Sequence, residues 1–134
     1  MVALSASTYL PAIVSIFGIM CTGAGFNAIL RPKPALSLIG WLEYKPASPL
    51  DKKVIDTLIL IYSMRDIYMD LAEIGAAYYN NVQVLGSVMI AGSAVAFADG
   101  AICRKMIGHS QGSHWILASI MTAFGAVCLV LLDC

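Results

Sequence analysis

Four ionisable residues lie close together in the segment YSMRDIYMDLAEIG, which begins at Tyr62. Arg65 and Asp66 are adjacent, and Asp70 and Glu73 follow at intervals of four and three residues. On a helix this spacing puts the three acids on one face, within about 60° of each other. A protonated carboxyl group beside an ionised one can act as proton donor and acceptor, so this face is a candidate site for acid–base chemistry.

The same residues allow a functional and a structural interpretation. Ionisable side chains inside a membrane-spanning helix face the interior of a bundle or a wet cavity, and they are functional candidates for that reason. Arg65 with Asp66 or Asp70 can equally form a buried ion pair that fixes how the helices pack. Both interpretations stay open. We expect Asp66, Asp70 and Glu73 to be catalytic, and we expect Arg65 and Tyr62 to bind substrate.

The composition indicates a membrane protein with a single domain, residues 1–134. Of 134 residues, 60% are hydrophobic and 12% are charged, whereas a soluble domain carries about 25% charged residues. The net charge is zero and no basic block is present, so we expect no nucleic-acid partner. The four cysteines form no closely spaced pair, so we expect no metal. No motif for a redox cofactor is present, so we expect no cofactor.

The predicted fold is all-α, a bundle of four transmembrane helices at about 9–30, 49–79, 82–102 and 114–132. Ser48 and Pro49 predict the start of the second helix, as an N-cap and a first-turn proline. The third helix is rich in small residues, which let membrane helices approach closely. Between the first two helices, prolines predict a loop in which ALSLIGWL is a short interfacial segment.

The basic residues predict the orientation in the membrane. All of them except Arg65 lie in or beside the first and third loops, which the positive-inside rule places in the cytosol. Both termini then face the lumen, and we expect the membrane to be that of the endoplasmic reticulum. These loop residues are Arg31, Lys33, Lys45, Lys52, Lys53, Arg104 and Lys105.

Polar residues of the predicted helices fall into two groups by depth. A cytosolic group contains Asn27, Asp56, Asp99 and His114, and a deeper group contains Arg65 and the three acids after it. We expect Asp99 to contact His114, because only a short loop joins their helices. We also expect Asn27, Asp99 and His114 to take part in substrate binding.

The motifs MRDIYMDL, ADG (98–100) and the later histidine give the chain a resemblance to a known family. It resembles small four-helix integral membrane proteins of unknown function from fungi and bacteria, which are distantly similar to the DoxX-like group. Asp70 and Glu73 depart from the apolar or glycine-rich continuation of those proteins, which indicates a specialised member. The positions that the resemblance favours are Arg65, Asp66, Asp99, Gly100 and His114.

The resemblance also implies a function. Fungal proteins of this kind occur in secondary-metabolite gene clusters, where they act as cyclases or isomerases on terpenoid or polyketide intermediates. We therefore expect a cofactor-free cyclase or isomerase that acts by proton transfer or through a pericyclic reaction, and whose substrate is a hydrophobic small molecule in the lipid bilayer. Two alternatives stay open: a non-catalytic subunit that packs against a larger membrane enzyme through the face GSVMIAGSA, and a small proton-coupled transporter whose pathway a homodimer completes.

Overall fold

The computed structural model describes residues 9–38 and 45–130, and no strand occurs in these two ranges. The all-α prediction is confirmed for this part of the chain. The helices are α1 (Tyr9–Leu30), α2 (Pro32–Leu38), α3 (Pro49–Tyr78), α4 (Val82–Met106) and α5 (Gln111–Val130).

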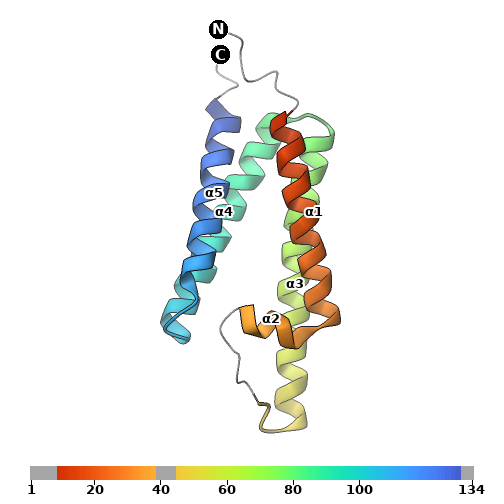
Figure 1. The fold of residues 1–134 in the computed structure, drawn as a ribbon, viewed down its shortest axis with the longest axis vertical. Helices are drawn as coiled ribbons and strands as arrows, with labels where there is room; N and C mark the ends of the chain where they lie inside the picture. The colour runs from red at the N-terminus through yellow and green to blue at the C-terminus, as the bar shows by residue number, and fades with distance from the viewer. Residues whose placement is uncertain (1–8, 39–44, 131–134) are drawn as a thin grey trace.

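The long helices form two antiparallel pairs, α1 with α3 and α4 with α5 (Figure 1). The most extensive contacts lie within these pairs, and the pairs are connected mainly through α3 and α4. They separate towards the α4–α5 loop, and the short α2 lies across that end (Figure 1). The arrangement is therefore two splayed helix pairs.

Three helices, α1, α4 and α5, are long and apolar enough to cross a membrane. The 30 residues of α3 span about 45 Å, more than the roughly 30 Å of a bilayer core. Because α3 contains charged residues, it is not among the helices that are apolar enough to cross a membrane by composition alone. The predicted interfacial segment coincides in part with α2, and its remainder, with Trp41, lies outside the described residues.

The ends of α3 and α4 follow from their capping residues. The Ser48 side chain accepts a hydrogen bond from the Asp51 backbone N–H at 3.1 Å, which confirms the predicted N-cap. Asn80 adopts a φ of 50° in the turn after α3, a conformation that asparagine tolerates better than most residues. The Asn81 side chain then caps α4 by accepting from the Val84 backbone N–H.

The connection between α4 and α5 is shorter than the sequence predicted. The segment CRKM belongs to α4, and α5 already begins at Gln111, so His114 lies one turn inside the helix rather than at its start. Arg104 and Lys105 fall in the last turn of α4, where the helix dipole favours cations. The charged residues that suggested a loop therefore stabilise a helix end.

Glycines allow the two helices of each pair to approach each other closely. A Cβ at Gly25 would lie 2.8 Å from Ile67 Cγ1, so α1 meets α3 there. A Cβ at Gly86 would lie 2.9 Å from the Gly125 carbonyl oxygen, so α4 meets α5. Gly86 belongs to the GSVMIAGSA face, which the sequence offered as a surface for a partner. Gly86 and three other residues of this stretch are buried inside the chain, and its remaining residues are partly or fully exposed.

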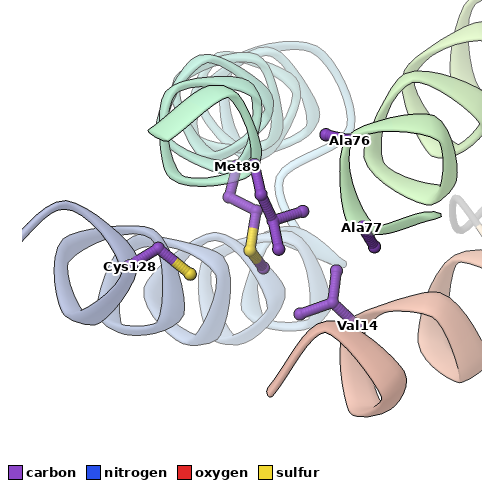
Figure 2. Packing of buried hydrophobic residues seen from close by; sticks show 6 residues of the cluster. Val14, Ala76, Ala77, Met89 and Cys128 are labelled. Atoms are coloured by element: carbon purple, nitrogen blue, oxygen red, sulfur yellow. The ribbon is translucent and has the colours of Figure 1, made fainter. Parts of the chain in front are cut away.

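A buried hydrophobic cluster connects the four long helices near the α3–α4 turn (Figure 2). Leu85 and Cys128 have no exposed surface, and Val14 of α1 packs with them. Ala76 and Ala77 bring the end of α3 into the same cluster. This end of the molecule is therefore closely packed, whereas the opposite half holds the cavity.

Candidate functional site

A cavity of about 560 Å³ lies between the two helix pairs, and all five helices contribute to its wall. Most of the lining is apolar, with Phe17 and Met121 among its side chains. Besides Cys21 and Tyr62, its ionisable lining residues are Asp66, Asp70 and Glu73 of α3, Asp99 of α4 and His114 of α5. The three acids of the predicted face therefore border one cavity.

An ion-pair network joins the two helix pairs beside this cavity. Arg65 Nη1 and Nη2 donate to the two Asp99 carboxylate oxygens at 3.2 and 2.7 Å. Arg65 Nε and Nη2 also donate to Asp66 Oδ1, at 3.2 and 3.0 Å. The prediction of two separate polar groups is wrong at this point, because the long arginine side chain reaches across to α4 and brings Asp99 into the deeper group.

Tyr62 completes the surroundings of the arginine. Its ring centroid lies 4.3 Å from Arg65 Cζ, a cation–π contact. Two carboxylates and an aromatic ring thus engage the guanidinium group, and Arg65 is not part of the cavity lining. This geometry favours a role in holding α3 against α4 over direct contact with a substrate.

Among the described residues, the carboxyl groups of Asp70 and Glu73 make fewer hydrogen bonds and ion pairs than those of Asp66 and Asp99. Thr22 Oγ1 of α1 donates to Asp70 Oδ2 at 3.5 Å, and no cation pairs with Asp70 within residues 9–38 and 45–130. Glu73 is 2% exposed, and among the described residues it has neither a hydrogen-bond nor an ion-pair partner. A buried carboxyl group without a partner is costly, so Glu73 is the least compensated acid of the cavity.

Thr22 was not among the predicted site residues. It lies on the same α1 face as Gly18 and Gly25, which approach α3 closely. The signal was a hydroxyl residue at helical spacing from two glycines in a helix without charged residues.

Two members of the predicted cytosolic group lie away from the cavity. Asn27 is exposed on α1, and Asp56 forms an ion pair with Lys52 at the surface of α3. Asp99 and His114 both line the cavity. The hydrogen bonds of the described residues do not include one between Asp99 and His114, because Asp99 is turned towards Arg65.

Gly100 explains how His114 is positioned. A Cβ at Gly100 would lie 2.4 Å from Trp115 Nε1 and 3.2 Å from His114 Cβ. Only a glycine therefore lets the first turn of α5 lie this close to α4. Arg104 Cζ lies 5.8 Å from the centroid of the Trp115 ring, a second contact of α4 with this side chain.

Ser63 is a second buried polar group in the cavity wall. It is 2% exposed, and its hydroxyl has no hydrogen-bond partner in the part of the chain that the structure describes. Within the same part of the chain, no group of three or more histidine, cysteine or acidic residues is arranged to hold a metal ion.

Comparison with known proteins identifies the family. The sequence profile described as "Domain of unknown function (DUF4267)" matches residues 18–128, which include the carboxylates of the cavity and His114. No curated protein and no solved structure matches the chain. Since the match extends over most of the sequence, this chain belongs to the DUF4267 family.

Proposed function

We propose that the chain is an integral membrane protein with four spans, in which α3 is the fourth. The polar face of α3 lines the cavity, and Ile61 and Leu71 are exposed elsewhere on this helix. The basic ends of α1 and α4 lie at the same end of the molecule (Figure 1). By the positive-inside rule that end is cytosolic, and we place the protein in the endoplasmic reticulum with both termini lumenal.

In this membrane the protein acts as a cofactor-free cyclase or isomerase on a lipophilic intermediate of the terpenoid or polyketide kind. One observation supports this most directly: Asp70 and Glu73 border a largely apolar cavity of about 560 Å³ without a cationic partner among the described residues. Cavities of about 300–1,000 Å³ bind drug-sized molecules. The resemblance of the chain to proteins from fungal secondary-metabolite clusters supports the same substrate class.

The proposed chemistry is proton transfer between this carboxyl pair and the substrate. Residues three apart on a helix are neighbours on its surface, so Asp70 and Glu73 can contact adjoining atoms of one molecule. One carboxyl group donates a proton to a carbon atom while the other removes a proton from a nearby position. The substrate keeps its composition, and the pair ends with the same number of protons.

Access from the bilayer fits a lipophilic substrate. Helices α1 and α5 both border the cavity, yet they make few contacts with each other. A molecule dissolved in the membrane can therefore approach the carboxyl pair between these helices without crossing water.

The test uses lipid extract from cells that lack the gene, incubated with purified protein in H₂O and in D₂O. The wild type should convert one component into an isomer of equal mass, and the product should gain one deuterium from D₂O. Asp70→Asn and Glu73→Gln should each abolish this product. Asp56→Asn, an amide change on the outer surface of the same helix, should retain it. Full conversion by both site variants would refute the proposal.

A further inference from the structure

The charges around the cavity do not balance. Four carboxylates line it, and Arg65 engages only Asp66 and Asp99. Among the described residues, no lysine or arginine contributes to the lining, and His114 is its one basic side chain. The cavity thus offers acceptors without a matching cation, and the buried Glu73 is the most isolated of them.

Ser63 is an independent sign that the cavity wall can bind a polar group. A serine inside a helix normally donates to a backbone carbonyl three or four residues earlier. Ser93, Ser119 and Thr122 all do so in α4 and α5. The Ser63 hydroxyl, although buried in the cavity wall, makes no such bond within the described part of the chain. It is left free for a polar group of a bound molecule.

We propose that the ligand is a lipophilic amine, whose nitrogen pairs with Glu73 and whose second polar group lies near Ser63. Ten helical residues separate these two side chains, which corresponds to about 15 Å along α3. The inference rests on the proposed function, because it names the substrate class of the same cavity. A neutral amine from the bilayer takes a proton from the Glu73 carboxyl group and leaves an ammonium–carboxylate pair.

Charge explains why other lipophilic molecules fit less well. A carboxylate ligand would be repelled by the acids of α3, and Arg65 has no free edge to receive it. An alcohol can donate to Glu73 but brings no charge, whereas hydrogen bonds between charged groups are roughly twice as strong as neutral ones. With the ammonium group held beside the Glu73 carboxylate, the protonated Asp70 donates a proton to an adjoining carbon atom while the Glu73 carboxylate removes one, as in the proposed reaction.

The test compares dodecylamine, dodecanol and dodecanoate as radiolabelled probes. Full-length protein is placed in phosphatidylcholine nanodiscs, and binding to empty nanodiscs is subtracted. The wild type should bind the amine at least tenfold more tightly than the alcohol and should bind the carboxylate most weakly. This comparison needs no variant, so misfolding cannot obscure it.

Three variants then locate the nitrogen and the second polar group. Glu73→Gln should reduce the preference for the amine over the alcohol to about one, whereas Asp56→Asn should leave it unchanged. Ser63→Ala should weaken binding of 12-aminododecan-1-ol several-fold without changing the affinity for dodecylamine. Asp70→Asn should keep the preference for the amine while losing turnover.

The outcomes separate this inference from the proposed function. Equal binding of amine and alcohol by the wild type, or tighter binding of dodecanoate, would overturn the amine class and leave a lipophilic cavity in place. An amine preference that survives Glu73→Gln would also overturn it. An amine preference without isomerisation of any lipid would support the inference and refute the proposed reaction.

Discussion

Arg65 and Asp99 lie on different helix pairs and meet through two parallel hydrogen bonds, of 3.2 and 2.7 Å. Such a fork-to-fork pair is specific in geometry. It lies beside the cavity, away from the hydrophobic cluster at the α3–α4 turn. The two helix pairs are thus joined by apolar packing at one end and by this ion pair farther along.

Removing the arginine should destabilise the fold more than removing one of its partners. Arg65→Gln leaves two carboxylates uncompensated, so we expect a loss of about 1–3 kcal/mol, between the values for buried and for exposed pairs. Asp99→Asn should cost less, because Asp66 still pairs with the arginine. The measurement is unfolding of the purified protein in mixed micelles. Lys52→Gln, in an exposed pair with Asp56, is the control and should change stability by less than about 1 kcal/mol.

Replacing Glu73 should stabilise the protein while abolishing its activity. The carboxyl group is buried and has no partner among the described residues, so Glu73→Leu removes a polar group from an apolar site. We expect a gain of about 1 kcal/mol or more, measured by the same unfolding assay. A loss of stability instead would show that Glu73 has a structural role.

The contact between α4 and α5 should depend on glycine. Gly86→Ala would place a methyl group 2.9 Å from both the Gly125 oxygen and Leu129 Cγ, and we expect a loss of about 1–3 kcal/mol. Gly23→Ala is the matched control, since no atom lies within 4 Å of its Cβ position. That change should be neutral or stabilising by up to about 1 kcal/mol. Similar effects of the two substitutions would contradict the proposed packing.

Gly100→Ala should displace the first turn of α5. The new methyl group would collide with the rigid Trp115 ring, 2.4 Å from its nitrogen, and His114 would move with it. In a Trp41→Phe background, the emission of Trp115 should shift to longer wavelength and ligand binding should weaken. Gly112→Ala, which meets no atom within 4 Å, should alter neither. Unchanged emission in both variants would mean that α5 does not depend on this glycine.

Residues at the two ends of α3 should lie on opposite sides of the membrane. Lys53→Cys should react with an impermeant maleimide in intact microsomes, whose cytosolic face is outward. Asn80→Cys should react only after the membrane is permeabilised. The wild-type protein, which carries only its native cysteines, measures the background labelling. Labelling of both positions from the same side would exclude α3 as a span.

The sequence predicted the elements better than the contacts between them. Apolar runs located α1, α4 and α5, and the Ser48–Pro49 signal located the start of α3, because these features depend on local chemistry. The grouping of Asp66, Asp70 and Glu73 on one wall followed from helical periodicity alone. The pairing of Arg65 with Asp99 could not be predicted in this way, because the helical spacing within α3 holds no information on which residue of α4 lies opposite. Asn27 and Asp56 were placed by depth only, and depth does not determine which side of a helix faces a cavity.

The pairing of Arg65 with Asp99 also has a consequence for how the protein is made. The ribosome completes α3 before any of α4 exists, so Arg65 enters the membrane with Asp66 but without its second carboxylate. Charged residues at the centre of a span disfavour insertion by about 2.5–3.5 kcal/mol each. We therefore expect α3 to insert poorly into the bilayer when the nascent chain stops at Tyr79. When the chain extends through Asp99, α3 should insert stably. Synthesis of the second helix pair would then complete the insertion of the first.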